Sequence, residues 1–165
     1  MGNGIQLIFS GLVVGIGATA LLDLWTIFQK KVFSAPPPNW CAVGRWVAYL
    51  PTGQFSHQSI AKVPSIKGEC IIGWLAHYLI GIVFGVTLFL LMGAEWAHQP
   101  TLYPALAFGI VTVIFPFFIL QPGLGLGIAA SKTANPNQAR LRSLLNHSIF
   151  GIGLYIFALI LAKLH

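Results

Sequence analysis

Apolar residues gather in four long runs along this chain of 165 residues. The runs cover residues 5–28, 71–92, 103–123 and 143–162. Each run is close to the ~20 residues that a helix needs to cross the hydrocarbon core of a bilayer. The pattern predicts an all-α protein, a four-transmembrane-helix bundle that forms a single integral membrane domain over residues 1–165.

Two polar segments, residues 29–70 and 124–142, separate these runs and carry eight of the nine lysine and arginine residues. The short turn at residues 93–102 carries none, and Lys163 is the exception at the other end of the chain. Basic residues accumulate in the cytoplasmic loops of membrane proteins. The two polar segments are therefore expected in the cytoplasm, and both termini outside, on the periplasmic face.

The first polar segment is expected to contain a short helix. Prolines occupy residues 36–38, and Asn39 is a suitable residue to cap the start of a helix. Apolar side chains then recur at helical spacing until Pro51: Trp40, Val43, Val47 and Leu50. We expect an interfacial amphipathic helix in this first cytoplasmic loop; the alternative is a tryptophan-rich loop that rests on lipid headgroups.

The two cysteines, Cys41 and Cys70, both fall in this segment. Cytoplasmic thiols normally stay reduced, so no structural disulfide is expected. The two residues are also far apart in the sequence and form no Cys-x-x-Cys pair, which argues against a zinc site.

The composition agrees with a membrane location. Of all residues, 56% are hydrophobic and only 7% are charged, whereas soluble globular proteins carry about 25% charged residues. A water-soluble core is therefore excluded, and the expected partner is the lipid bilayer. A net charge of +6 would suggest nucleic acid in a soluble protein, but here the position of the charges is more informative, and no nucleic-acid partner is expected.

Ionisable residues inside the apolar runs are the main candidates for chemistry, because hydrocarbon penalises them. Asp23, His77 and His147 each lie about 6–9 Å below the expected cytoplasmic boundary, at a rise of 1.5 Å per residue. Gln121 lies near the same end of the third run, and Asn146 precedes His147. These five residues are predicted to form one buried polar site.

Small residues recur at four-residue steps beyond these candidates: Gly11, Gly15 and Thr19 in the first run, Gly81 and Gly85 in the second, and Gly151 with Tyr155 in the fourth. Such stripes let helices approach closely in a membrane. The pattern predicts tight helix packing around the site.

Three functions remain open for this site. The first is a transporter-like or channel-like protein in which Asp23 and His77, aided by Gln121 and His147, bind or relay a proton or small cation. The second is a redox protein that binds haem b or a metal ion through His77 and His147. The third is a structural or interaction protein whose polar residues only join helices. Four helices enclose little volume, so a homodimer is expected if anything larger passes.

Other polar residues suggest less. Arg45, Arg140 and Arg142 could bind an anionic lipid headgroup. His57 and His98 lie outside the runs and are expected to be solvated. No catalytic residue is predicted, because Ser148 directly follows His147 and neighbours on a helix point about 100° apart, and an enzyme is the less favoured class.

Several short motifs together resemble a known family. They are Gly17-Ala-Thr-Ala20 with Asp23-Leu-Trp25, Val43-Gly-Arg-Trp46, Pro51-x-Gly-x-Phe-x-His57, Gly73-Trp-x-x-His77-Tyr78, Gln121-Pro122, Ala129-Ala-Ser131 with Asn135-Pro136, Ala139-Arg-Leu-Arg142, and Phe150-Gly-x-Gly-Leu-Tyr155. This set resembles the bacterial domain-of-unknown-function family 2938 over nearly the whole chain. The resemblance implies a multi-pass protein of the bacterial inner membrane with four helices, and it implies no activity.

Overall fold

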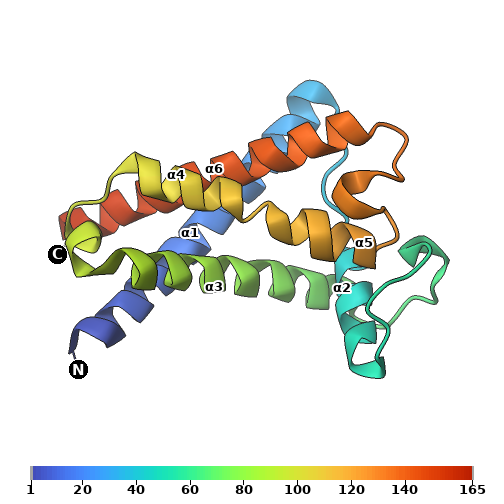
Figure 1. The fold of residues 1–165 in the computed structure, drawn as a ribbon, viewed down its shortest axis with the longest axis horizontal. Coiled ribbons are helices and arrows are strands. Elements are labelled where there is room, and N and C mark those ends of the chain that lie inside the picture. The colour runs from blue at the N-terminus through green and yellow to red at the C-terminus, as the bar shows by residue number, and fades with distance from the viewer. Residues whose placement is uncertain (1, 165) are drawn as a thin grey trace. The chain divides into compact units, whose positions relative to one another are not determined.

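The structure, a computed structural model, describes residues 2–164, and these form helices and loops without a strand (Figure 1). The α-helices are α1 (Gly2–Phe33), α2 (Trp40–Tyr49), α3 (Glu69–His98), α4 (Leu102–Val111), α5 (Gln121–Gly123) and α6 (Pro136–Leu164). Shorter turns are η1 (Leu50–Thr52), η2 (Ile60–Lys62), the π-helical η3 (Pro116–Leu120) and η4 (Ile128–Ala130).

Four segments of the structure are long and apolar enough to cross a membrane: Gly4–Phe33, Glu69–His98, Leu102–Gly123 and Pro136–Leu164. They contain the four predicted runs and extend beyond most of their ends. The all-α class and the four spans are therefore confirmed.

Two span ends differ from the sequence expectation. The helix of the second span breaks at Gly93, which has φ of 75° and ψ of −175°, and a short helical segment then continues to His98. Only glycine adopts such a conformation at little cost, which explains the residue at this break. The last helix begins at Pro136, well before residue 143, because a proline at the first helical position has no N–H to leave unpaired.

The third span is interrupted near its middle. Its first helix ends at Val111, and a π-helical turn follows at Pro116–Leu120. Pro116 has no backbone N–H, so the regular hydrogen bond to the carbonyl of Thr112 cannot form. The interruption places Thr112 at a bend in the span.

The short helix α2 begins where the sequence predicted it. The side chain of Asn39 accepts a hydrogen bond from the backbone N–H of Ala42 at 3.0 Å and so caps the first turn. The helix is confirmed, whereas its position at the membrane interface stays a prediction.

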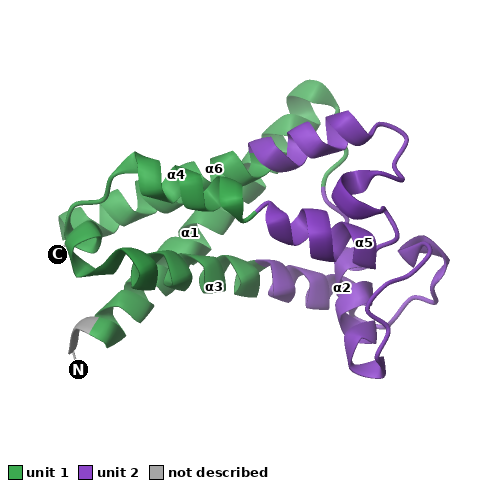
Figure 2. Ribbon diagram, in the orientation of Figure 1, with its two compact units in different colours: residues 1–37, 78–112, 146–165 green, residues 38–77, 113–145 purple. Residues whose placement is uncertain are grey.

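The chain divides into two compact units, coloured separately in Figure 2. Unit 1 comprises residues 1–37, 78–112 and 146–165, and unit 2 comprises residues 38–77 and 113–145. The second, third and fourth spans each pass from one unit to the other within their length.

In unit 1 the small residues lie where helix backbones touch. A side chain added at Gly11 would come within 2.5 Å of the Cα atom of Val86, and one added at Gly109 would come within 2.5 Å of the Cα atom of Gly151. A side chain added at Gly15 would likewise collide with the backbone carbonyl oxygen of Gly81. The predicted tight packing is confirmed in this unit.

Between these contacts unit 1 has a dry apolar core. Its fully buried members include Val14, Ala18, Leu88, Phe89 and Leu154, all with at most 1% of their surface exposed. Val14 and Ala18 lie on α1 between Ser10 and Asp23, which are about 20 Å apart along the helix at a rise of 1.5 Å per residue.

In unit 2 the structure corrects one expectation, because Cys41 and Cys70 form a disulfide. The two residues are 29 positions apart, but α2 lies directly against the first turns of α3. Gly44 and Gly73 make this approach possible: a side chain at Gly44 would collide with the carbonyl oxygen of Glu69, and one at Gly73 with that of Trp40. Neither the expected compartment of the two cysteines nor their spacing in the sequence indicates this contact between the helices.

Candidate functional site

Asp23 lies on α1 in unit 1, half-buried, and its carboxylate accepts a hydrogen bond from the hydroxyl of Tyr78 on α3 at 2.9 Å. The two helices are close because Gly81, one turn beyond Tyr78, packs against Thr19, one turn before Asp23. Sequence reasoning missed Tyr78. The sequence indicates Tyr78 only by its position in an apolar span, next to His77, because a tyrosine hydroxyl there needs a hydrogen-bond partner.

A second polar contact joins α1 to α6. The indole N–H of Trp25 donates to the side-chain oxygen of Asn146 at 3.1 Å. One residue further along α1, the hydroxyl of Thr26 donates to the backbone carbonyl of Asp23 at 2.9 Å. Asn146 therefore contacts the same stretch of α1 that carries the carboxylate, and its partner there is Trp25.

His147 takes part in a hydrogen-bond chain with α4. The hydroxyl of Thr112 donates to the carbonyl of Gly109 at 2.6 Å and also lies 2.8 Å from Nδ1 of His147. Because the single hydroxyl proton is directed to Gly109, we assign the proton of the second bond to Nδ1. In the neutral ring Nε2 is then an acceptor. Thr112 was missed because its only sequence signal was its place four residues before Pro116.

His77 lies in unit 2, in an aromatic environment. Its ring stacks on Trp40 with centroids 3.9 Å apart and an interplanar angle of 24°, and it meets Trp74 edge-on at 5.8 Å. The side chain is 9% exposed. Neighbours on a helix point about 100° apart, so Tyr78 and His77 present their side chains to different surroundings.

Gln121 also lies in unit 2, and its amide nitrogen is 3.3 Å from the hydroxyl of Ser143, to which it donates. Its side-chain oxygen is buried without a hydrogen-bond partner among the described residues, and so is Nε2 of His57. The backbone N–H of His57 donates to the carbonyl of Gly123 at 3.1 Å. His57 is therefore half-buried with its Nε2 shielded from solvent, and is not fully solvated as expected.

Arg45 holds the loop of unit 2 together. It forms a two-pronged ion pair with Glu69, with nitrogen–oxygen distances of 2.7 and 2.8 Å, and donates to the carbonyls of Ile60 and Val63. The hydrogen bond to Glu69 raises the pKa of the guanidinium above its usual value. All three guanidinium nitrogens thus donate to Glu69 or to carbonyls of the loop, and the expected contact of Arg45 with a lipid headgroup stays a prediction.

Arg140 donates to the carbonyl of Ala129 at 2.9 Å and to the side-chain oxygen of Asn137 at 3.1 Å, and Arg142 is half-buried. Their role toward lipid headgroups stays a prediction. So does ligation of haem b or a metal ion by His77 and His147. Within residues 2–164 no three histidine, cysteine or acidic side chains are grouped so that they could hold a metal ion.

In sum, unit 1 contains Asp23, Asn146 and His147, each paired with a neutral polar side chain on another helix, and unit 2 contains His77 and Gln121. Four apolar helices with such internal polar pairs define a multi-pass helical membrane protein.

The chain belongs to the family of proteins of unknown function DUF2938, whose model matches residues 12–161. Comparison with curated proteins gave no match, and comparison with solved structures gave none either.

Proposed function

We propose that this protein is a small transporter-like or channel-like protein in which Asp23 binds or relays a proton or a small cation. The observation that carries this proposal is the hydrogen bond from Tyr78 to the carboxylate of Asp23 inside two membrane-spanning helices. An ionisable group at such a depth is costly and is commonly part of an ion or proton pathway.

Tyr78 gives the carboxylate a partner that suits both of its states. A phenol can donate to an ionised carboxylate and can accept from a protonated one. The pair can therefore keep its hydrogen bond when the carboxyl group takes up or releases a proton. A lysine or arginine in place of Tyr78 would instead keep the carboxylate ionised.

His147 is the second titratable residue of unit 1, and its Nε2 is an available acceptor when the ring is neutral. Its Nδ1 is fixed by Thr112, which orients the ring. In the proposed function His147 accepts protons that pass through unit 1, and His77 and Gln121 contribute from unit 2.

We also propose that the protein resides in the bacterial inner membrane with residues 29–70 and 124–142 in the cytoplasm and both termini in the periplasm. The eight basic residues of these two segments support this orientation. In this orientation Arg140 and Arg142 lie at the depth of the cytoplasmic lipid headgroups. A homodimer would enclose a wider pathway than four helices can.

Flux in proteoliposomes tests the function. Wild-type protein should dissipate an imposed gradient of protons or small monovalent cations, measured with an internal fluorescent dye. Asp23→Asn should abolish the flux, and Tyr78→Phe should reduce it. Glu95→Gln, which changes an exposed acid, is the matched control and should leave it unchanged.

Two results would count against this proposal. Wild-type vesicles that behave like empty ones under every gradient would exclude flux through the protein. A loss of thermal stability in Asp23→Asn without any wild-type flux would favour the structural function, in which the polar pairs only join helices.

A further inference from the structure

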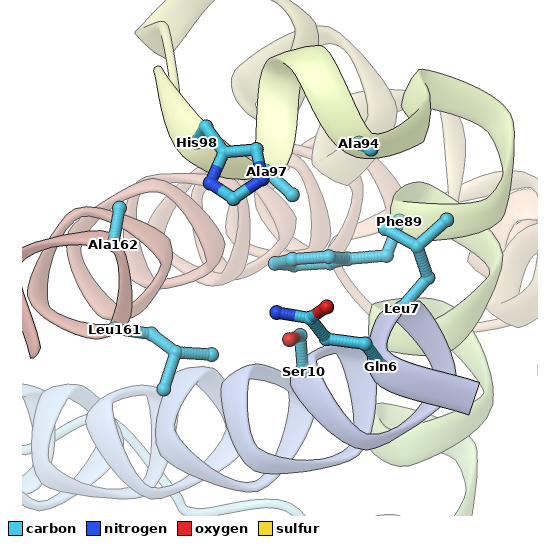
Figure 3. A pocket seen from close by; sticks show the side chains of 9 residues that line it. All are labelled: Gln6, Leu7, Ser10, Phe89, Ala94, Ala97, His98, Leu161 and Ala162. Atoms are coloured by element: carbon cyan, nitrogen blue, oxygen red, sulfur yellow. The ribbon is translucent and has the colours of Figure 1, made fainter. Parts of the chain in front are cut away.

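Unit 1 contains a small cavity at the end formed by the first turns of α1 and the last turns of α3 and α6. Its volume is about 60 Å³. The lining residues are Gln6, Leu7, Ser10, Phe89, Ala94, Ala97, His98, Leu161 and Ala162. Figure 3 shows the side chains of Gln6 and Ser10 and the ring of His98 turned toward a shared space beside the ring of Phe89.

Ser10 indicates that this space is built for a polar occupant. Its side chain is 93% buried, since only 7% of its surface is exposed, and Figure 3 shows its hydroxyl turned toward the cavity. Serine hydroxyls inside apolar helices usually bond to a carbonyl one turn earlier, as Thr19 does to Gly15 in the same helix. A buried hydroxyl aimed into a cavity instead points to a ligand there.

The cavity is large enough for a small polar ligand. Its 60 Å³ is well above the ~10–15 Å³ of such space that one water molecule needs.

The lining selects among small species. None of the nine lining residues is acidic, which disfavours a divalent cation, because such ions need carboxylate ligands. None is lysine or arginine, and the electron-rich face of Phe89 repels an anion. The oxygens of Gln6 and Ser10, a nitrogen of His98 and the aromatic face together suit a monovalent cation that donates hydrogen bonds.

We propose that this cavity binds an ammonium-type monovalent cation. The site is separate from that of Asp23, because the fully buried Val14 and Ala18 lie between the two on α1. The proposal goes beyond the proposed function and does not depend on it, since binding here can be measured without flux. If both proposals hold, unit 1 contains two separate binding sites for a small cation.

Thermal unfolding of the purified full-length protein in detergent tests the site. The probe is ammonium chloride at about pH 8, where free imidazole is neutral, compared with potassium chloride and choline chloride at equal ionic strength. Ammonium should raise the melting temperature in a saturable manner, potassium should raise it less because it donates no hydrogen bonds, and choline should have no such effect.

Variants then locate the binding. Ser10→Ala and the exposed Gln6→Met should each weaken the apparent affinity for ammonium at least about tenfold, which corresponds to loss of one hydrogen bond to a charged group. Ser65→Ala, an exposed serine of unit 2, is the matched control. Gln6→Met keeps the test valid if Ser10→Ala does not fold.

Three results would overturn the proposal: an equal shift in all three salts, an ammonium shift that survives both cavity variants, or one that disappears in Asp23→Asn. The last would assign ammonium to the Asp23 site. Retention of the shift in Asp23→Asn, even in a protein without flux, supports the cavity.

Discussion

The two units of this protein are stabilised in different ways. Unit 1 is built from helices whose backbones touch at glycine residues around a core of apolar side chains that exclude water. Unit 2 contains a long polar loop fixed by a disulfide, by the ion pair of Arg45 with Glu69, and by the stack of Trp40 on His77. The stability of unit 1 therefore depends on the close fit of its helices, whereas the stability of unit 2 depends on a few directional contacts.

The same difference applies to their polar groups. In unit 1, the carboxylate of Asp23 and the imidazole of His147 each have a neutral hydroxyl as partner. In unit 2, the charge of Arg45 is balanced by Glu69 and satisfied by backbone carbonyls. A neutral hydroxyl can stay bonded to a titratable group in either charge state, while an ion pair favours the charged state of both partners. This is why the proposed function is placed in unit 1.

The largest effect should come from filling a backbone contact of unit 1. Gly15→Leu places a side chain against the carbonyl of Gly81, which cannot move without separating α1 from α3. We expect a loss of about 3 kcal/mol or more in the free energy of unfolding, at or beyond the upper end for overpacked cores. Chemical unfolding in detergent, followed by circular dichroism, measures it. Gly4→Leu is the control, because nothing lies within 4 Å of that position, and equal losses in both variants would contradict the account.

The disulfide of unit 2 should have the next largest effect. It closes a loop of 29 residues, and its removal in Cys41→Ser/Cys70→Ser should lower the free energy of unfolding by at most about 3–4 kcal/mol. If the segment is cytoplasmic, the pair is reduced in growing cells and closes on oxidation. Acid quenching followed by a thiol-reactive polymer label would show this as two labelled cysteines per chain. Unlabelled protein from quenched cells would place the segment on the oxidising side of the membrane and reverse the proposed orientation.

The sequence predicted the spans well and their contacts only in part. Hydropathy and length are sufficient to locate helices in a membrane, and the depth of Asp23 follows from its distance to the end of its run. The direction of a side chain around its helix does not follow from hydropathy. For that reason Tyr78, whose hydroxyl donates to Asp23, was not among the predicted site residues, although its neighbour His77 was. The disulfide depends on a close contact between α2 and α3 that no spacing rule reveals.

A smaller and more local effect is expected from Arg45→Met in unit 2. Without the guanidinium, the carbonyls of Ile60 and Val63 lose their donor and the loop is no longer tied to Glu69. Trypsin should then cut faster after Lys62 and Lys67, which are exposed, while the melting temperature of the helices changes little. Limited proteolysis with mass analysis measures the rate. Glu69→Gln keeps a hydrogen-bond acceptor for Arg45 and should show an intermediate rate of cleavage. An unchanged rate in Arg45→Met would show that Arg45 does not fix the loop.

The effect confined to the fewest atoms should follow from Thr112→Val in unit 1, which keeps the shape of the side chain and removes its hydroxyl. The chain from His147 through Thr112 to Gly109 is then broken, and Nδ1 of His147 loses its acceptor. We expect a loss of about 1–2 kcal/mol in the free energy of unfolding. The more specific readout is the pair of imidazole ¹⁵N chemical shifts of His147, which report the site of the ring proton. They should change from a single Nδ1-protonated form toward a mixture of both tautomers.

Tyr78→Phe is the comparison variant: it should cause a similar loss of stability but leave the imidazole shifts unchanged, because Tyr78 bonds to Asp23 and not to the His147 chain. If Thr112→Val leaves the shifts as they are, another group holds the ring, and His147 is not oriented by the bend in the third span.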